Sequence, residues 1–320
     1  MNTLGRVEAR SMSEVEHTTL DAMRRPTQEL EARDAPLLIR GGVASWPALS
    51  RWSPDYLARR LGPVEVAYKT SSSNAHPDFR VGGLARMFAR ERAPLSRFLE
   101  LISTGPMAER ARYLFTGDEQ FLLRRRAGQT QVAPELAPLL ADLVTPPLFA
   151  EDRLYSVWPW LSGPGVRTWL HYDNNGCHNL NAQISGRKRC VLYGPEALAE
   201  LAPFPLGGDN PAHNCSRIDV ERPTATLDVR RAAASAWHAE LGPGDLLFIP
   251  AWWFHTFEHL GAFNANVNFW WKPARPIWNA VAARQSLVDA AAAARLDARD
   301  PAIAAVLGAL DAAAVERCSG

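Results

Sequence analysis

The sequence has little of what marks several large classes of protein. Its 320 residues include four cysteines, Cys177, Cys190, Cys215 and Cys318, with irregular spacing and no Cys-X-X-Cys pair. A disulfide framework is therefore not expected, and we interpret these cysteines as reduced thiols. No apolar run is long enough to span a bilayer, and the polar N-terminus lacks the apolar stretch of a secretory signal. We expect a soluble, cytoplasmic protein with no membrane partner.

Charge of one sign is also not in excess. The formal net charge is +1 at pH 7, so no overall field favours a polyanion, and nucleic acid is not expected as a partner. The sequence is 47% hydrophobic, which is enough for a substantial core. Its eleven tryptophans gather in the middle of the chain, which fits an aromatic-lined core or pocket.

Composition and residue pattern divide the chain into four segments. Residues 1–18 are expected to be loosely ordered. Residues 19–150 mix helical and strand patterns, and residues 151–273 are rich in short β runs separated by Gly, Pro and Asn turns. This spacing predicts a β-sandwich or barrel. Residues 274–320 are Ala-rich with helical spacing, and predict C-terminal helices that either pack on the barrel or form a dimer interface.

Within the second segment, four local patterns predict structure. Pro36–Arg40 is expected to be a strand, and Ser53 followed by a proline is typical of a helix start. The spacing over Arg86–Ser103 predicts a helix. The basic stretch RRRAGQTQ, residues 124–131, is expected to be a solvated loop.

The stretch TWLHYDNNGCHN carries the strongest chemical signal. His171 and Asp173 are two residues apart, so in an extended strand their side chains point to the same face. A third ligand must come from another strand, and His255 in GPGDLLFIPAWWFH is the best candidate. Two histidines and one carboxylate form the facial triad that binds Fe(II) and leaves positions open for a co-substrate and oxygen. Mn(II), Zn(II) and Ni(II) also suit such a ligand set.

Other histidines and cysteines compete for this role less well. Cys177 and His178 lie in a turn close to the pair, and a thiolate on an oxygen-activating iron invites oxidation. The remaining candidates lie in a loop or beside strands, where an ordinary structural role is the simpler interpretation: His213, Cys215, His238 and His259.

Taken together, NLNAQISGRKRCVLY, GPGDLLFIPAWWFH, NVNFWWK and the N-terminal PLLIRGGVASWPALSRWS resemble the JmjC-type, cupin-like Fe(II)/2-oxoglutarate oxygenases. The pattern is most similar to the branch that contains the asparaginyl hydroxylase known as factor inhibiting hypoxia-inducible factor. The resemblance runs from about Pro36 to Lys272. It implies a mainly β fold with flanking helices, namely a double-stranded β-helix (jelly-roll) core with N-terminal α/β elements and a C-terminal helical tail.

The resemblance also implies roles for individual residues. His171, Asp173 and His255 match the iron ligands. The remaining matches are residues that contact 2-oxoglutarate. Lys188 and Thr168 match the residues that bind its distal carboxylate, and Asn179 and Asn268 match the amides near its metal-side carboxylate. Tyr113 matches a tyrosine that helps to hold the same molecule. The connection after Asp173 is two residues longer than in the asparaginyl hydroxylase, and such an insertion can reshape the wall that faces the substrate.

Three of these assignments have independent physical support. Lys188 lies in a segment expected to be half-buried, where a cation is costly unless it has a partner. Asn179 and Asn268 are poor strand formers, so their presence in segments that otherwise favour strands indicates a polar functional role inside a barrel or cross-strand hydrogen bonding. Trp252, Trp253, Trp270 and Trp271 are expected to be mainly core packing.

The implied reaction couples conversion of 2-oxoglutarate and O2 into succinate and CO2 to oxidation of a substrate. A protein or peptide side chain is the first substrate hypothesis. A small molecule or a modified tRNA base is the second, and N-methyl-lysine demethylation is the third. A non-catalytic cupin that only binds metal is the alternative outside enzymes, although it gives no reason to keep Lys188.

Overall fold

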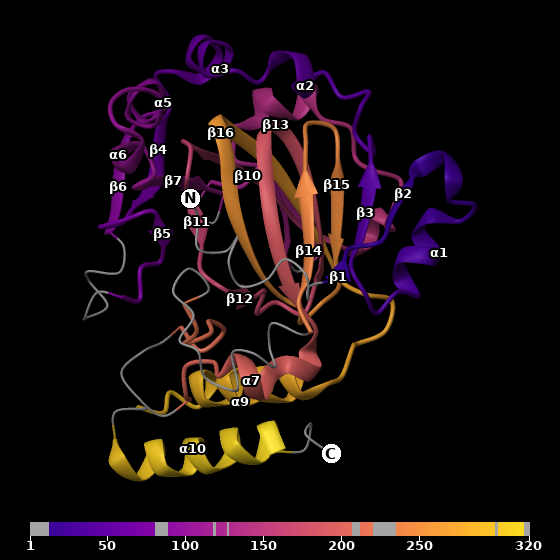
Figure 1. Ribbon diagram of the computed structural model, residues 1–320, viewed down its shortest axis with the longest axis vertical. Helices are drawn as coiled ribbons and strands as arrows, with labels where there is room; N and C mark the ends of the chain where they lie inside the picture. Colours follow the sequence, from indigo (N-terminus) through magenta and orange to yellow (C-terminus); the bar gives the residue numbers. More distant parts are fainter. Residues whose placement is uncertain are drawn as a thin grey trace.

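In a computed structural model the chain folds around one large sheet whose centre is formed by its two longest strands (Figure 1). The structure describes residues 13–80, 89–117, 120–126, 128–206, 212–219, 235–297 and 300–316. The main path through the sheet runs β2-β3-β15-β13-β16-β10-β7-β4-β6. The described strands are β1 (Ser13–Glu14), β2 (His17–Thr19), β3 (Leu37–Arg40), β4 (Glu65–Thr70), β5 (Ala75–His76), β6 (Ala89–Pro94), β7 (Tyr113–Thr116), β8 (Leu123–Arg126), β9 (Gln129–Gln131), β10 (Leu154–Ser162), β11 (Arg167–Thr168), β12 (His171–Tyr172), β13 (His178–Tyr193), β14 (Trp237–Leu241), β15 (Leu246–Ile249) and β16 (Phe254–Trp271).

Helices flank this sheet. The α-helices are α1 (Pro26–Glu31), α2 (Ala48–Arg51), α3 (Pro54–Leu61), α5 (Leu95–Ser103), α6 (Met107–Arg110), α7 (Leu198–Leu201), α9 (Ala280–Ala293) and α10 (Pro301–Glu316). Short 3-10 turns occur at Leu20–Ala22, Ala137–Asp142, Glu151–Arg153 and Pro195–Ala197. Ser53 caps α3 by accepting a hydrogen bond from the Tyr56 amide, as its sequence predicts. Among the described residues, no helix is both long and apolar enough to cross a bilayer.

The two long strands β13 and β16 pair antiparallel along most of their length. The first half of β13 also pairs with β15, and its second half pairs with β14. Each long strand therefore takes part in both layers of the barrel. The double-stranded β-helix expected from the sequence is confirmed, with α/β elements and C-terminal helices at its flanks.

A bulge in the middle of β13 decides which side chains face the inside of the barrel. The register of β13 against β16 shifts on both sides of Ser185. Gly186 lies here with φ of +73°, and an added Cβ would stand 2.4 Å from the Phe263 carbonyl oxygen, so only glycine fits. A bulge changes the inward parity of a strand. As a result Asn179 and Asn181 on one side of the bulge and Lys188 on the other face the same cavity.

Three local predictions need correction. The helix expected over Arg86–Ser103 begins at Leu95, because residues 89–94 form strand β6 and pair with β4. Residues 86–88 lie outside the described part of the chain. The expected basic loop at 124–131 is instead a β8–β9 hairpin in its described residues. The segment 1–18, expected to be loosely ordered, contains β1 and the start of β2 in its described residues. β1 pairs with β14, and β2 pairs with β3. Residues 1–12 are outside the described part.

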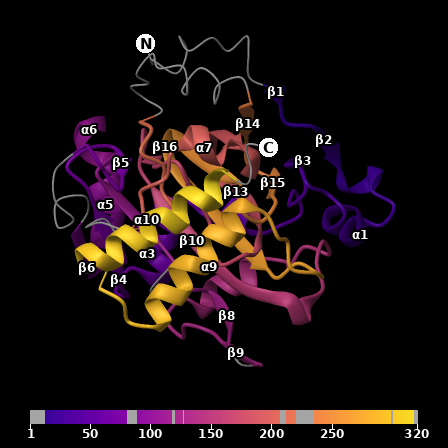
Figure 2. The same cartoon turned by 90° about the horizontal axis from the view of Figure 1, so that it is seen from below.

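The C-terminal helices lie at the end of the sheet that carries β12 (Figure 1). Seen from below, α9 and α10 lie in front of the sheet (Figure 2). Val281 of α9 is fully buried in one apolar cluster with Leu170, Tyr172 and Phe254. The helices therefore pack on the barrel next to the strand that holds His171. The four-segment division of the chain stays a prediction.

Candidate active site

His171, Asp173 and His255 converge at one point inside the barrel. The pairing of β12 with β16 places the Cα atoms of His171 and His255 opposite each other, and Asp173 follows directly after β12. The Asp173 Oδ1 atom lies 3.9 Å from the Nε2 atom of each histidine. One ligand atom from each residue lies within 4.8 Å of the others. This is a spacing that one divalent ion can bridge with small side-chain movements.

Backbone hydrogen bonds fix which nitrogen of each histidine is available. The Nδ1 atom of His171 lies 2.7 Å from the Trp169 carbonyl oxygen, and that of His255 lies 3.1 Å from the Trp253 carbonyl oxygen. A carbonyl only accepts, so each Nδ1 carries the proton and each Nε2 presents a lone pair. Enclosure in the cavity, followed by the nearby His255, lowers the pKa of His171 to about 4. His171 is therefore neutral at physiological pH and suited to bind a metal.

Asp173 is arranged to offer a single oxygen. Its Oδ2 atom accepts hydrogen bonds from Trp270 Nε1 at 2.7 Å and Asn179 Nδ2 at 3.0 Å. Burial alone would raise the pKa of this carboxyl, but the two imidazoles and these hydrogen bonds outweigh it and hold the pKa below its ordinary value. Asp173 is thus a carboxylate with Oδ1 directed at the histidines. Two imidazoles and one anionic oxygen fit Fe(II) or Mn(II).

The triad lines a cavity of about 480 Å³ that also contains the expected co-substrate residues Lys188, Thr168, Asn179 and Asn268. Lys188 is 2% exposed. Its Nζ atom contacts the Oδ1 atoms of Asn266 and Asn181 and lies 4.8 Å from the centre of the Phe257 ring. Burial lowers the pKa of Lys188 to about 7. Within the described part of the chain, no carboxylate pairs with it.

Thr168 lies in β11 and is buried. Its Oγ1 accepts a hydrogen bond from the Phe257 amide at 2.9 Å, so the hydroxyl proton remains available to donate. A donor hydroxyl and a buried ammonium in one small cavity are suited to an anionic ligand.

Sequence reasoning missed several residues of this site, and Asn181 and Asn266 are the two whose amide oxygens contact Lys188. Both are buried, both line the cavity, and both contact Lys188. The signal was present as alternating asparagines in NLN and NANVN, since residues two apart on a strand share a face. Thr116, Trp158 and Trp160 also line the cavity and were not expected there.

Tyr113 does not line the cavity, which is a correction to its expected role. Its ring packs 6.2 Å from that of Tyr68, beside the main core. Strand alternation explains the difference, because Tyr113 and Phe115 share one face of β7 while Thr116 is on the other. Thr116 is the β7 residue that reaches the cavity.

The competing ligands lie elsewhere, with one exception. His178 is fully buried against Phe248 and Trp271, on the opposite face of β13 from Asn179. His259 does line the cavity, but its Nδ1 is hydrogen-bonded to Ser162 and burial keeps its pKa well below the ordinary value.

Among the described residues, the cysteines and the remaining histidines do not line the cavity. Burial raises the pKa of the Cys177 and Cys215 thiols to about 12. His213 bonds the Pro205 carbonyl. His238 lies in β14, and Cys318 lies outside the described residues.

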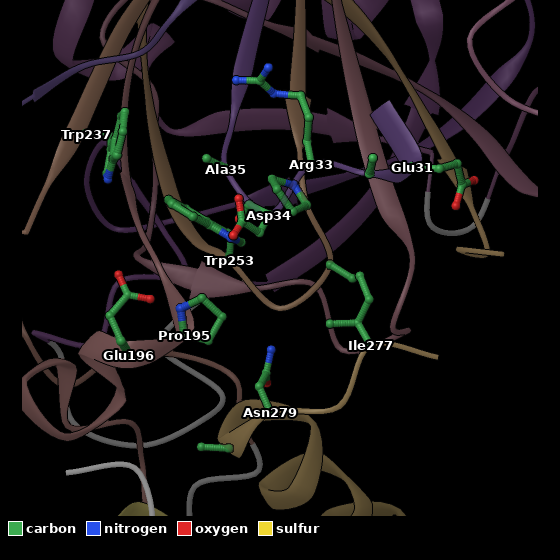
Figure 3. Close-up of a pocket in the computed structure, with 14 residues that line it drawn as sticks. Glu31, Arg33, Asp34, Ala35, Pro195, Glu196, Trp237, Trp253, Ile277 and Asn279 are labelled. Atoms are coloured by element: carbon green, nitrogen blue, oxygen red, sulfur yellow. The ribbon is translucent and has the colours of Figure 1, made fainter. Parts of the chain in front are cut away.

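A larger cavity of about 740 Å³ lies elsewhere on the molecule (Figure 3). Trp237, Trp253, Asp34 and Glu196 are among its lining residues, and Figure 3 shows their side chains. None of the three candidate ligands lines it. The candidate active site is the smaller cavity, because the three possible metal ligands and the buried lysine are found there.

Comparison with known proteins agrees with this architecture. The profile of the family described as "Cupin-like domain" matches residues 24–275. The chain is 31% identical over 231 residues to tRNA wybutosine-synthesizing protein 5 of Danio rerio, covering 71% of this chain and 65% of that protein. It is 30% identical over 269 residues to Lysine-specific demethylase JMJ31 of Arabidopsis thaliana, covering 76% and 47%. For tRNA wybutosine-synthesizing protein 5 of Homo sapiens the identity is 28% over 250 residues, covering 77% and 73%.

The match thus spans slightly under two thirds of the first of these relatives and about half of the second. The family profile, in contrast, covers most of this chain, and it covers both the ligand triad and Lys188. The chain belongs to the JmjC-type cupin-like family.

Proposed function

We propose that the chain is an Fe(II)- and 2-oxoglutarate-dependent oxygenase that hydroxylates its substrate. Substrate, O2 and 2-oxoglutarate would give hydroxylated substrate, succinate and CO2. One observation carries the proposal: Lys188 is buried in the same cavity as the triad without a carboxylate partner among the described residues. A buried cation is costly unless it is paired, and a ligand with a carboxylate at this depth would supply the missing charge.

Each residue has a distinct task under this proposal. His171 and His255 through Nε2, and Asp173 through Oδ1, would hold the metal. The bound iron supplies the oxidising chemistry, with 2-oxoglutarate as the source of electrons. Lys188 and Thr168 would orient the distal carboxylate of 2-oxoglutarate. Trp270 and Asn179 keep the Asp173 carboxylate in place. No separate general base is required. A non-catalytic metal-binding cupin would have no use for Lys188.

The charge of the cavity favours a neutral or anionic substrate. Lys69 and Arg90, paired across β4 and β6, line the cavity together with Lys188. Asp173 is the only acidic residue among the described residues that line it. A methylated lysine is a cation and finds no second carboxylate there, which counts against demethylation. Our first proposal for the substrate is an uncharged or acidic side chain of a protein or peptide.

A modified tRNA base is the second candidate. The relatives named tRNA wybutosine-synthesizing protein 5 favour it, and so do the basic residues of the cavity, because phosphate contacts come from Lys and Arg. Arg124, Arg125 and Arg126 of β8 add positive charge next to β10. The chain as a whole carries a net charge of only +1, which is why the tRNA base stands second.

The test is succinate formation from 2-oxoglutarate by anaerobically iron-loaded protein after O2 is admitted. We expect turnover that requires Fe(II) and is lost in His171→Ala and Lys188→Ala, while His238→Ala, outside the cavity, keeps it. Peptide libraries and tRNA are then added, and the accepted substrate is the one that stimulates succinate and gains one oxygen atom by mass. Absence of turnover together with absence of 2-oxoglutarate binding would leave the metal-binding cupin instead.

A further inference from the structure

A chain of side-chain hydrogen bonds runs along the wall of the cavity from Lys188 to Asp173. It begins where Lys188 Nζ donates to Asn266 Oδ1 at 2.5 Å. Asn266 Nδ2 donates to Asn268 Oδ1 at 2.5 Å, and Asn268 Nδ2 donates to Asn179 Oδ1 at 3.1 Å. Asn179 Nδ2 completes the chain by donating to Asp173 Oδ2 at 3.0 Å. Three amides thus join the expected co-substrate anchor to the expected metal ligand.

All three amides point the same way. Each presents its oxygen toward Lys188 and its NH2 group toward Asp173. The chemistry of the two ends requires this, because an ammonium can only donate and a carboxylate can only accept. The amide dipoles are therefore aligned between a cation and an anion, and reversing any one of them would break at least two hydrogen bonds.

Asn181 forms a second branch at the lysine end. Its Nδ2 donates to Asn268 Oδ1 at 3.1 Å, and its Oδ1 lies 3.5 Å from Lys188 Nζ. Asn181 and Asn266 are 2% and 1% exposed. The ammonium group is thus held by two neutral oxygens and the face of the Phe257 ring. These contacts fix its position without cancelling its charge.

We propose that Asn266, assisted by Asn181, is a positioning residue that reserves Lys188 for a carboxylate ligand. An aspartate at either position has nearly the same shape, but it would form an internal ion pair with Lys188 and compete with the ligand. The amides hold the ammonium in place while its charge remains available. This inference rests on the proposed function, since it takes the carboxylate to be the distal one of 2-oxoglutarate.

The lowered pKa of Lys188, about 7, agrees with this role. A carboxylate neighbour would hold a buried ammonium charged, whereas amide oxygens compensate only part of the cost of burial. Charging Lys188 is therefore unfavourable in the free protein, and a bound carboxylate relieves that cost. The free energy gained by pairing Lys188 with a carboxylate would therefore increase the affinity for the ligand and would not stabilise the ligand-free fold.

The experiment compares Asn266→Asp with the unmodified protein. We expect calorimetry on Mn(II)-loaded protein to show 2-oxoglutarate binding at least about tenfold weaker, which corresponds to about 1.4 kcal/mol. Thermal unfolding should move in the opposite direction, with a higher Tm, because the new ion pair with the buried lysine should outweigh the loss of the hydrogen bond from Asn266 Nδ2 to Asn268 Oδ1. A residue with a merely structural role would lower both quantities. Binding of 2-oxopentanoate, which lacks the distal carboxylate, should not be weakened by the substitution.

Asn264→Asp is the matched control. Asn264 lies on the same strand and is equally buried, but it bonds the Leu260 carbonyl and Gln183 and does not line the cavity. We expect it to lower Tm and to leave 2-oxoglutarate binding unchanged. Asn181→Asp should repeat the effect of Asn266→Asp if the latter does not fold. Failure of the unmodified protein to bind 2-oxoglutarate would overturn the proposed function. Binding by the unmodified protein and both Asp variants with equal affinity would overturn only this inference.

Discussion

His171 and His255 face each other directly across the antiparallel pair β12–β16, with ring centroids 4.5 Å apart. Asp173 then needs only to follow the end of β12 to bring its Oδ1 within 3.9 Å of both Nε2 atoms. Because all three ligands depend on one strand pair, the register of that pair determines whether the site exists. A slip by one residue would turn His171 to the other face of the sheet.

The first prediction concerns the support of Asp173 by Trp270. Trp270→Phe keeps an aromatic ring but removes the N–H group that donates to Oδ2. We expect metal affinity to fall about 10- to 100-fold, as is usual when a hydrogen-bond partner of a ligand is lost. Mn(II) titration followed by calorimetry measures this. Trp237→Phe, distant from the cavity, controls for the loss of an indole, and equal affinities in the two variants would contradict the prediction.

The second prediction is that 2-oxoglutarate binding weakens as pH rises above about 7. The pKa of Lys188 in the free protein is about 7 because of burial, and a bound carboxylate favours the charged lysine. Above this pH the free lysine is neutral, so binding must take up a proton. Calorimetry at several pH values, in two buffers with different ionisation enthalpies, measures both the slope and the proton uptake.

Lys188→Met provides the control for this pH dependence and adds a stability readout. The variant should lose 2-oxoglutarate affinity, and any remaining binding should show no slope near pH 7. In the unfolded state Lys188 keeps its proton up to the ordinary lysine pKa, whereas in the folded state it loses this proton near pH 7. Stability should therefore rise with pH between these two values, and Lys188→Met should remove that rise. A slope that persists in Lys188→Met would assign the titration to another group.

The sequence was sufficient for the parts of the site that follow simple periodicity. His171 and Asp173 share a face because they are two residues apart, and the structure brings His255 to them. The face of the strand on which Lys188 lies does not follow from alternation alone. Strict alternation along β13 would send Asn179 and Lys188 to opposite faces, and only the bulge at Gly186 brings both into one cavity. That bulge depends on the fit against Phe263, which no local pattern reports.

The errors lie where tertiary pairing outweighs local preference. Residues 89–94 have a composition that suits a helix, but β4 supplies a row of unpaired backbone groups and draws them into a strand. Arg124, Arg125 and Arg126 are ordered in the same way by pairing with β9 and β10. Tyr113 was placed by family resemblance, and the register of β7 turns it toward the core instead. The homodimer is untested and stays a prediction.

The third prediction is that homodimer. Val306 and Leu310 of α10 are 60% and 43% exposed, beside an entirely apolar groove between α9 and α10. Exposed apolar patches of this kind mark interaction surfaces. We expect sedimentation velocity to report a dimer, and the double substitution Val306→Glu with Leu310→Glu to give a monomer. Ala305→Glu, on the same helix but outside the groove, should remain dimeric. A monomer at all concentrations of the unmodified protein would exclude this interface.

The fourth prediction concerns Arg284, which ties the C-terminal helices to the wall of the site. Arg284 is fully buried, its Nε donates to Asp311 Oδ1 at 2.6 Å, and its other nitrogens bond the Phe204 and His213 carbonyls. It also reaches the hydroxyl of Tyr172, the residue between His171 and Asp173. Removing one partner leaves the other as an uncompensated buried charge.

We therefore expect Arg284→Ala to lower the free energy of unfolding by about 3–5 kcal/mol in urea denaturation. Arg97→Ala is the matched control, because Arg97 pairs with Glu100 on the surface and both side chains are 55% exposed. It should leave the free energy of unfolding nearly unchanged, because an exposed ion pair adds little to stability. In Arg284→Ala with Asp311→Ala, the loss should be clearly smaller than the sum of the two single losses, because the second substitution removes the orphaned charge. Additive losses would show that the two residues act separately, and would contradict a role of this ion pair in holding α9 and α10 together.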